Sequence, residues 1–472
     1  MEIKTIQDAK ELLWSHQHKI TWIESSAFLI YFLWIFLSDF EIIVYKDSLD
    51  TDLLKKHYKI KSLNTLIPWK IWRLSVLHDK DIQNYLLQQK RKYIITRKET
   101  MDMEELVTSL WMKLLGNKST IRAQYENKKT FRDILKEMDI IPILGENIPI
   151  DSFLASWYDI WASRYWEKIV IQLPDITKWW GSWTLFINNT TDFIAFQKKI
   201  SDKTYKWKDI SSINITTFIS GISWSIIGCV TRYGTLTNAI QTQIIDIPEV
   251  ISSKKWSWLF CWHDWGFKHY SSTIQKKADT IVQKIWGHMF KNGYTWIFWL
   301  DLIIDEHHNE VYIVECNSRY TWALPLLSML DMQANNLPMD VFHLLEHLNI
   351  DYSMDFDTIN QAYKNKKNGS HIILSNKQEE HIMCKKELPS WVYIHKNHEL
   401  IFQREGYSYA DIQNEHEFII TDWNPKKWQI IKWYTESCRI CHLLFSSSIL
   451  ETHHNLKKHV KEIIASIYKE LF

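Results

Sequence analysis

The chain has 472 residues, of which 46% are hydrophobic and 24% are charged, and its 56 Lys and Arg nearly balance its 55 Asp and Glu. This length is too great for one ordinary core and predicts two or three domains, and the composition excludes a largely disordered chain. The net charge of +1 argues against general binding to nucleic-acid backbones, which requires a basic excess.

No segment predicts export or membrane insertion. Met1 is followed by the charged, helix-like EIKTIQDAKELL, and the longest apolar run, 27–37, has 11 residues, too few to span a bilayer. Six cysteines in this length do not make a disulfide framework. We therefore expect a cytoplasmic protein with neither a membrane nor a nucleic acid as its partner.

The first 120 residues alternate between strand and helix patterns. Strands are expected at 19–23, 41–45 and 92–96, and helices at 25–37 and 103–115. Strand, helix and strand at this spacing form a unit of a parallel sheet. We predict an α/β domain over residues 1–120.

The next 225 residues mix helices with longer strands. Phe131, Ile134, Leu135 and Met138 have helical spacing, and an extended piece is expected at 140–144. Further strands are expected at 168–173, 214–220 and 226–232, a helix at 273–290, and a hairpin of strands 296–304 and 311–317 that turns at 305–310.

The remaining residues predict a small third unit. The lysine-rich segment 363–371 is typical of a linker or exposed loop. Short strands are expected at 392–394, 400–403 and 418–421, followed by an amphipathic helix at 456–472.

Glycine and tryptophan usage depart from the ordinary. There are 11 Gly and 26 Trp, whereas average usage would give about 33 Gly. Trp423 stands in TDWNPKKWQ, where Asp-Gly-Asn-Pro would make a turn and Asp-Trp-Asn-Pro would not. We hypothesise that many Trp positions hold glycine in the native protein, as they would if UGA codons were read as glycine. The alternative is a Trp-rich protein that stacks sugars or other ligands on aromatic faces.

The expected hairpin carries a group of oxygen ligands. Side chains alternate along a strand, so Glu315 and Asn317 point the same way, about 7 Å apart. The turn would bring Asp301 near Glu315, and two carboxylates with an amide oxygen suit Mg²⁺ (or Mn²⁺). Arg319 could face the same cleft and neutralise developing negative charge. The alternative is a set of ordinary outward polar residues.

Read with glycine at Trp322, this segment resembles the C-terminal signature of the ATP-grasp superfamily, the ATP-dependent carboxylate–amine or carboxylate–thiol ligases and their biotin-carboxylase relatives. The signature is an acidic residue in an apolar strand, a strand ending Glu-x-Asn-x-Arg, and then a Gly and a Pro; here these are Asp301, Glu315, Asn317, Arg319, Trp322 and Pro325. The resemblance implies a Rossmann-like preATP-grasp domain at 1–120, an ATP-grasp domain at 121–345 with a lid at about 165–225, and a small α+β domain at 350–472.

The resemblance also implies which residues bind the nucleotide. Lys128 would contact the ATP phosphates, and the backbone of Thr217, Phe218 and Ile219 would hold the adenine. Gln172 stands where a phosphate-binding lysine is common, and Lys178 would substitute for that lysine. The glycine-rich lid loop would consist of Lys178, Trp179, Trp180, Gly181, Ser182, Trp183 and Thr184.

The implied activity is Mg²⁺-dependent formation of an acyl phosphate from a carboxylate and ATP, followed by attack of an amine or similar nucleophile. Arg319 and Arg232 would stabilise the transferring group. The partners would be a small carboxylate, a small amine and a second copy of the chain in a homodimer. Two alternatives stay open, a Trp-rich ligand-binding protein without catalysis and a catalytically silent ATP-binding module. UGA codons at Trp179, Trp180, Trp183 and Trp322 would favour the enzyme, and UGG codons there the ligand-binding protein.

Overall fold

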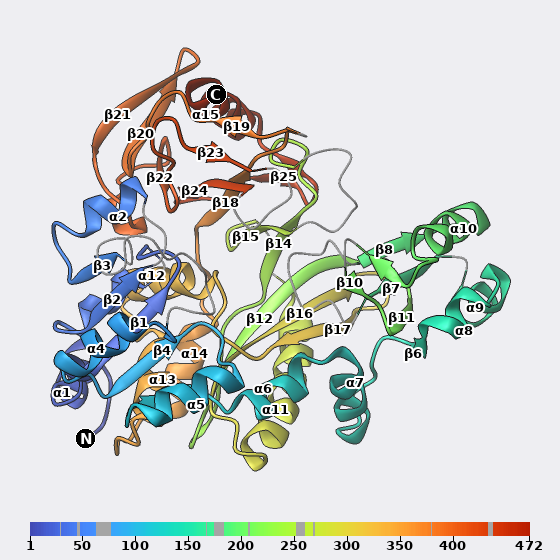
Figure 1. Ribbon diagram of the computed structural model, residues 1–472, viewed down its shortest axis with the longest axis horizontal. Helices are drawn as coiled ribbons and strands as arrows, with labels where there is room; N and C mark the ends of the chain where they lie inside the picture. The colour runs from blue at the N-terminus through green and yellow to red at the C-terminus, as the bar shows by residue number, and fades with distance from the viewer. Residues whose placement is uncertain are drawn as a thin grey trace.

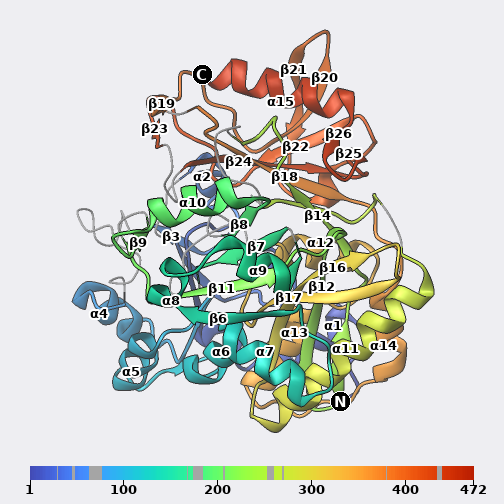
Figure 2. The same ribbon diagram turned by 90° about the vertical axis from the view of Figure 1, so that its right-hand side faces the viewer.

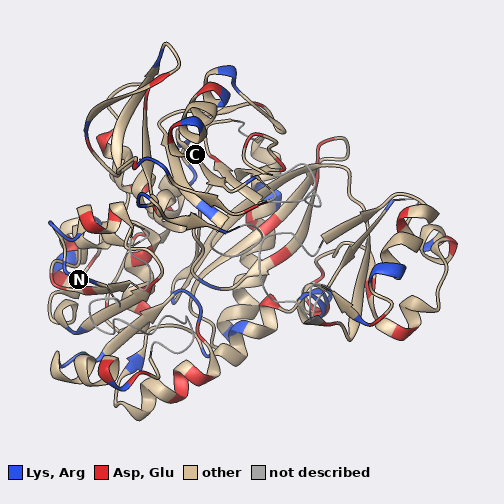
Figure 3. Ribbon diagram, turned by 45° about the horizontal axis from the view of Figure 1, so that its top comes forward, with Lys and Arg blue, Asp and Glu red and all other residues tan. Residues whose placement is uncertain are grey.

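The computed structural model describes residues 1–28, 30–44, 48–62, 77–166, 168–173, 184–205, 208–251, 260–267, 270–378, 380–432 and 438–472. They form an N-terminal parallel sheet, a small antiparallel sheet that projects to one side and a long sheet that connects the two halves of the chain (Figure 1). No helix among these residues is both long and apolar enough to cross a membrane. Basic and acidic residues are interspersed over the ribbon (Figure 3), in keeping with the near-zero net charge.

The N-terminal region has the predicted α/β organisation. Its five parallel strands lie in the order β3-β2-β1-β4-β5. The strands are β1 (Ile20–Glu24), β2 (Glu41–Val44), β3 (Ile60–Ser62), β4 (Tyr93–Thr96) and β5 (Lys113–Leu114), and the helices are α1 (Ile6–Leu13), α2 (Leu49–Leu54), α4 (Lys80–Gln88) and α5 (Met101–Ser109).

Two predicted helices of this region differ from the structure. The expected helix at 25–37 is wrong, because the described residues of this range, 25–28 and 30–37, form only the short 3₁₀ helix η2 (Tyr31–Ile35). Tyr31, Phe32, Leu33, Phe36 and Leu37 are buried, and such a nearly continuous apolar run lacks the polar face that alternates with the apolar stripe of an amphipathic α-helix. The helix expected at 103–115 instead ends at Ser109, and residues 113–114 join the sheet as β5.

The projecting sheet lies at the right of Figure 1 and has a core of its own. Its strands are antiparallel in the order β6-β11-β7-β8. They are β6 (Gly145–Pro149), β7 (Ile169–Gln172), β8 (Thr184–Ile187) and β11 (Ser212–Thr217), with helices α8 (Ile150–Leu154), α9 (Tyr158–Tyr165) and α10 (Thr190–Lys199) and the short pair β9 (Thr204–Tyr205) and β10 (Lys208–Asp209). The chain reaches this sheet through α6 (Ser119–Glu126) and α7 (Lys128–Glu137).

The long sheet has eleven strands in the order β17-β16-β12-β14-β15-β18-β24-β22-β20-β21, with β13 paired to β12. Its first members are β12 (Ile222–Thr231), β13 (Gly234–Thr237), β14 (Gln241–Ile245), β15 (Phe260–Asp264), β16 (Trp296–Asp305) and β17 (Glu310–Asn317). The C-terminal part adds β18 (Ser370–Ser375), β20 (Trp391–Lys396), β21 (Glu399–Glu405), β22 (Glu417–Thr421) and β24 (Arg439–Phe445). The predicted hairpin is present as β16 and β17.

Helices and two short strand pairs cover this sheet (Figure 2). The helices are α11 (Ser272–Lys291), α12 (Leu324–Gln333), α13 (Met339–His347), α14 (Phe356–Tyr363) and α15 (Lys458–Leu471), and the strand pairs are β19 (Ile382–Met383) with β23 (Ile430–Ile431) and β25 (Leu450–Thr452) with β26 (Asn455–Leu456). The segment expected to be a linker at 363–371 is shorter, because β18 begins at Ser370 and pairs with β15. The predicted domain boundaries stay a prediction.

Several tryptophans have a backbone conformation that suits glycine. Among the described residues, positive φ occurs at Trp111, Trp166, Trp262, Trp296, Trp423 and Trp428, with values from 57° to 149°. For a residue with a large side chain this region is strained, whereas glycine adopts it freely. The buried indole nitrogen of Trp296 also has no hydrogen-bond partner in the described part of the chain.

Trp111 occupies the glycine position of a helix end. After α5, the Trp111 N–H donates to the Thr108 carbonyl at 3.0 Å and the Met112 N–H donates to the Val107 carbonyl at 3.0 Å. This pair of bonds is the Schellman motif, whose left-handed residue is usually glycine. Here that residue is Trp111, with φ of 57° and 94% exposure.

We expect Trp111→Gly to raise the free energy of unfolding by about 1 kcal/mol, because glycine relieves the left-handed strain and the exposed indole contributes little packing. Urea unfolding measures the difference. Trp14→Gly is the matched control, since Trp14 is 68% exposed but has right-handed helical φ of −51°. Glycine there should lower stability by up to about 1 kcal/mol. Equal effects of the two substitutions would contradict the backbone argument.

Candidate active site

Asp301, Glu315 and Asn317 come together on the hairpin of β16 and β17. Asp301 lies directly opposite Glu315 in the register, and Asn317 lies opposite Trp299. The Asn317 amide donates to Asp301 Oδ2 at 2.9 Å and to Glu315 Oε1 at 3.3 Å. The structure therefore groups the three residues that the sequence indicated as metal ligands.

The two carboxyl groups have opposite electrostatic environments. Burial, and then the neighbouring Glu315, raise the pKa of Asp301 well above its usual value. Lys128 binds Glu315 through its ammonium group and lowers the pKa of Glu315 to about 2. The cluster holds one carboxylate ionised and the second ready to ionise beside an added cation.

The donor set fits a hard divalent cation. Two carboxylates and one amide supply oxygen ligands, and the oxygen and nitrogen of an amide exchange places by a simple rotation. No group of three His, Cys, Asp or Glu side chains suited to a metal occurs in the described part of the chain. Asn317 as the third ligand stays a prediction. Gln243, which sequence reasoning missed, orients Asp301 by donating to its Oδ1 at 2.6 Å.

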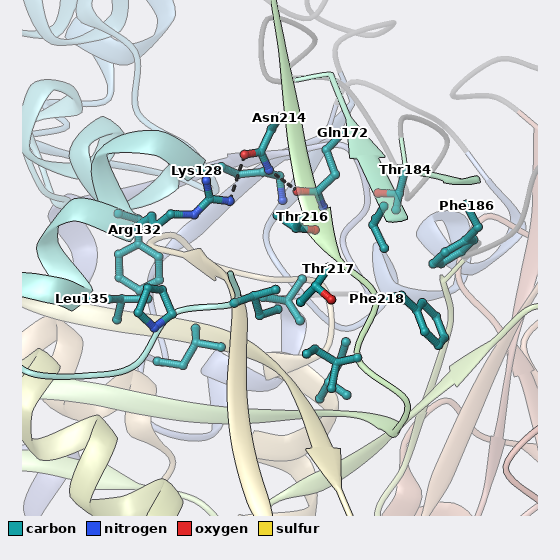
Figure 4. Close-up of a pocket in the computed structure, with 18 residues that line it drawn as sticks. Lys128, Arg132, Leu135, Gln172, Thr184, Phe186, Asn214, Thr216, Thr217 and Phe218 are labelled. Carbon is teal, nitrogen blue, oxygen red and sulfur yellow. Dashed lines mark hydrogen bonds between the residues drawn. The ribbon is translucent and has the colours of Figure 1, made fainter. Parts of the chain in front are cut away.

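Lys128 links this cluster to a pocket between the projecting sheet and the long sheet (Figure 4). It is the first residue of α7, and the side chain of the capping residue Asn127 accepts hydrogen bonds from the N–H groups of Lys129 and Thr130. The helix start thus fixes the place from which Lys128 reaches Glu315.

The pocket lies between the two sheets and is mainly apolar. It contains six of the residues expected to bind the nucleotide: Lys128, Gln172, Thr184, Thr217, Phe218 and Ile219. The apolar lining is Phe131, Leu135, Pro142, Ile143, Val170, Phe186, Ile303, Ile313 and Val314, and the other polar lining residues are Arg132, Asn214 and Thr216. Apolar walls with a few placed polar groups are typical of a small-molecule or cofactor site.

The backbone expected to hold the adenine is partly engaged already. The N–H of Thr217 donates to the Leu144 carbonyl at 2.9 Å, and the N–H of Phe218 donates to the Lys168 carbonyl at 3.2 Å. These two groups cannot also donate to a bound base. Of the three backbone N–H groups expected to contact adenine, only that of Ile219 therefore stays a candidate donor.

A chain of polar side chains crosses the pocket and includes two residues that sequence reasoning missed. Arg132 donates to Asn214 Oδ1 at 2.9 Å, and the Asn214 amide donates to Gln172 Oε1 at 2.9 Å (Figure 4). Arg132 follows Lys128 by one helical turn on α7 and brings a second cation toward the pocket. Because Lys178, Trp179, Trp180, Gly181, Ser182 and Trp183 lie outside the described residues, their predicted contacts stay a prediction.

Arg319 is held at the edge of the cluster of Asp301, Glu315 and Asn317 by a buried acid. It forms an ion pair with Glu126, which also binds Arg122 and Lys98. Burial alone would raise the pKa of Glu126, but these three cations hold that pKa well below its usual value. Glu126 is thus ionised and fixes the direction of Arg319, a role that the sequence did not reveal.

The structure does not bring Arg232 to this site. Arg232 directly follows β12, seven residues beyond Ser225, which pairs with Asp301. Seven strand residues span about 23 Å. Arg232 instead forms an ion pair with Glu346 of α13 at 3.2 Å, so its expected catalytic role has no support from its position.

Glu99, which lies next to the ion pairs of Glu126, should make the stability of the protein depend on pH. It is 0% exposed and lies 3.6 Å from Arg122, and burial raises its pKa to about 8. The folded state therefore holds the proton on the Glu99 carboxyl group more tightly than the unfolded state does. The free energy of unfolding should fall as pH rises from about 5 to 8.

Glu99→Gln should remove this fall, which can reach about 5 kcal/mol for a shift of this size. Urea midpoints measured between pH 5 and pH 9 test the expectation. The exposed Glu105→Gln on α5 serves as the control and should leave the slope unchanged. If the urea midpoint of the Glu99→Gln variant fell with pH as steeply as that of the unsubstituted protein, Glu99 would not be the group responsible.

The fold is similar to that of several enzymes of known structure, two of them solved with a bound adenine nucleotide. The biotin carboxylase domain of 2-oxoglutarate carboxylase from Hydrogenobacter thermophilus, a dimer solved with MgADP, ADP and bicarbonate, has a TM-score of 0.61 and 10% identity over 91% of this chain and 86% of that chain. Biotin carboxylase from Campylobacter jejuni scores 0.60 with 11% identity over 96% and 91%. L-amino acid ligase from Bacillus licheniformis scores 0.56 with 11% identity over 96% and 98%.

No family model and no curated protein matches the sequence. The structural likeness nevertheless covers nearly the whole chain, and it confirms the mixed α/β and α+β architecture, which is similar to that of biotin carboxylase and L-amino acid ligase.

Proposed function

We propose that this protein is an ATP-dependent ligase that activates a carboxylate as an acyl phosphate and joins it to an amine. The observation that carries the proposal is the position of Lys128, which lines the apolar pocket and binds Glu315 of the acidic cluster. An adenine in the pocket would then direct the phosphates of ATP past Lys128 toward Asp301, Glu315 and Asn317. The three residues would hold Mg²⁺, which supplies charge neutralisation at the phosphates when bound.

The chain's own residues have separate roles in this reaction. Lys128 and Arg132 bind phosphate oxygens, and the apolar lining holds the base. Arg319, directed by Glu126, stabilises the negative charge on the transferring phosphoryl group. The projecting sheet covers the nucleotide and keeps water from the activated carboxylate.

The bonds change in two steps. A carboxylate oxygen of the substrate attacks the γ-phosphorus, the bond to the bridging oxygen breaks, and ADP leaves from the acyl phosphate. The amine nitrogen then attacks the acyl carbon, phosphate leaves with the bonding electrons, and the nitrogen loses a proton to form the amide. Each turnover yields one ADP, one phosphate and one amide.

The test is ADP release from MgATP with panels of carboxylates and amines. Two proteins are compared, the printed sequence and a variant with glycine at Trp179, Trp180, Trp183 and Trp322. Release that requires both a carboxylate and an amine supports the ligase. Tight MgATP binding with no turnover on any pair identifies a silent nucleotide-binding module, and failure to bind MgATP in both proteins refutes the proposal.

Assembly and location belong to the same proposal. The Hydrogenobacter thermophilus structure is a dimer, and we infer a homodimer here, which light scattering on the eluting protein would test. The small carboxylate and amine are the other partners, and the cytoplasmic location stays a prediction.

A further inference from the structure

Every carboxylate oxygen of the acidic cluster of Asp301, Glu315 and Asn317 already accepts a hydrogen bond from the protein. Asp301 Oδ1 accepts from the Gln243 amide at 2.6 Å, and its Oδ2 accepts from the Asn317 amide at 2.9 Å. Glu315 Oε1 accepts from the same Asn317 amide at 3.3 Å, and its Oε2 accepts from the Lys128 ammonium. The cluster is therefore satisfied in hydrogen bonds without a metal ion.

Lys128 supplies the positive charge of this arrangement. Its ammonium forms an ion pair with Glu315, and the two side chains are 23% and 36% exposed, so water screens the pair only in part. A divalent cation bound to Glu315 would need the same carboxylate, and two positive charges on one carboxylate repel each other. Lys128 and a metal ion therefore compete for Glu315.

A bound nucleotide would offer the ammonium a different partner. Lys128 also lines the pocket between the projecting sheet and the long sheet. A lysine carries its charge on a flexible four-carbon stem, and the start of α7 is held by the side chain of Asn127, so the ammonium can turn while the backbone stays in place. Phosphate oxygens in the pocket would thus draw the ammonium away from Glu315.

Asn317 also has the orientation that suits a site without a metal. Its amide nitrogen donates to both carboxyl groups, whereas Mg²⁺ takes oxygen ligands. A half turn of the amide would bring its oxygen toward the same place. The hydrogen bonds of Asn317 and the ion pair of Lys128 thus stabilise one arrangement, and a metal ion requires that both change.

We propose that Lys128 blocks the metal site of the nucleotide-free protein. Its ammonium holds the place of the cation at Glu315, and the phosphates of the nucleotide draw it away, so that a divalent cation enters only together with the nucleotide. The inference rests on the proposed ligase and adds the regulation of its metal site. Because linkage between two ligands is reciprocal, the metal and the nucleotide then strengthen each other's binding by the same factor.

The test measures Mn²⁺ binding to the full chain without nucleotide, by electron paramagnetic resonance of the free ion at constant ionic strength. Lys128→Gln should tighten this binding by at least about tenfold, because Glu315 loses the cation that competes with Mn²⁺. Lys128→Met is a second neutral variant and should have the same effect. Both substitutions should weaken the binding of ATP measured without a metal, because the phosphates lose a positive charge, and these two opposite effects distinguish the block from general damage to the fold.

Two control variants remove the same unit of charge from α7 without touching Glu315. Lys129→Gln changes the next residue, which is exposed. Arg132→Gln changes a cation of the pocket that donates to Asn214 Oδ1 at 2.9 Å. Each should change the affinity for Mn²⁺ without nucleotide by less than about threefold. An effect of Lys128→Gln that either control reproduces would reflect the net charge and not the ion pair, and it would refute the inference.

Two further results would overturn the inference. The first is that folded Lys128→Gln and Lys128→Met bind Mn²⁺ without nucleotide no more tightly than the unsubstituted protein does. The second is that the unsubstituted protein binds Mn²⁺ as tightly without ATP as with it. This second measurement needs no substitution, so it decides the question even if neither neutral variant folds.

The outcome separates this inference from the ligase proposal, because the block is measured by Mn²⁺ binding and the ligase by ADP release. ADP release that requires a carboxylate and an amine, with Mn²⁺ binding unchanged in the Lys128 variants, refutes only the block. Tighter Mn²⁺ binding in those variants, with no ADP release from any pair of substrates, refutes only the ligase.

Discussion

Asp301→Asn should lower Mg²⁺-dependent ADP release by about 100- to 1,000-fold, which corresponds to roughly 3 to 4 kcal/mol of lost transition-state stabilisation. The side chain keeps its size but loses the charge that a divalent cation requires. Glu315→Gln should have an effect of similar size, because Asp301 and Glu315 face each other across one strand pair. ADP release at saturating MgATP, measured over a range of Mg²⁺ concentrations, records both effects.

The matched control for these variants is Asp305→Asn at the end of the same strand. Asp305 accepts hydrogen bonds from the N–H groups of His307 and His308 in the turn, so it tests whether any amide on β16 lowers activity. We expect less than a threefold change. Full activity in Asp301→Asn at low Mg²⁺ would refute the metal assignment.

Arg319→Ala should lower the turnover number by about 100- to 1,000-fold while changing the MgATP affinity little, because the guanidinium acts on charge that develops in the transition state. Arg319→Lys should recover only part of the rate, since a lysine lacks the paired donors that contact two oxygens. Steady-state kinetics with the best carboxylate and amine separates kcat from KM.

Two further variants show whether position or charge decides the effect. Glu126→Gln leaves Arg319 in place but removes the carboxylate that fixes it, and we expect an intermediate loss of rate. Arg232→Ala removes an arginine that pairs with Glu346 away from the cluster and should change the rate less than threefold. A larger effect of Arg232→Ala than of Arg319→Ala would contradict the geometry.

The sequence predicted the hairpin because a hairpin is formed by residues that are close together in the chain. Alternating side chains and a polar turn are enough to place Asp301 opposite Glu315, as the structure does. Gln243 and Glu126 were missed because they reach the cluster from distant segments, through pairing of β14 with β12 and packing of α6 near β17. The number of residues between such positions and the cluster does not predict that they lie close together in the fold.

The failed helix at 25–37 and the early end of α5 have different causes. In the first, the run is hydrophobic but has no alternating polar face, and such a run does not by itself specify an α-helix. In the second, the sequence has Trp111 at a position where a glycine would have predicted the end of the helix. The positive φ at that residue is visible only in the structure. The Trp and Gly counts pointed to the anomaly, and the backbone identifies particular positions.

The unbroken pairing of β15 with β18 has a consequence for fragments of this protein. A chain that stops after α14 would leave β15, whose residues are almost all buried, as an open and apolar border with unsatisfied N–H and C=O groups. Unpaired edge strands of this kind form hydrogen bonds with other chains and promote aggregation. The residues after α14 therefore cover this edge of the half that holds the proposed active site, and shortened forms should be insoluble even though every residue proposed to bind ATP is retained.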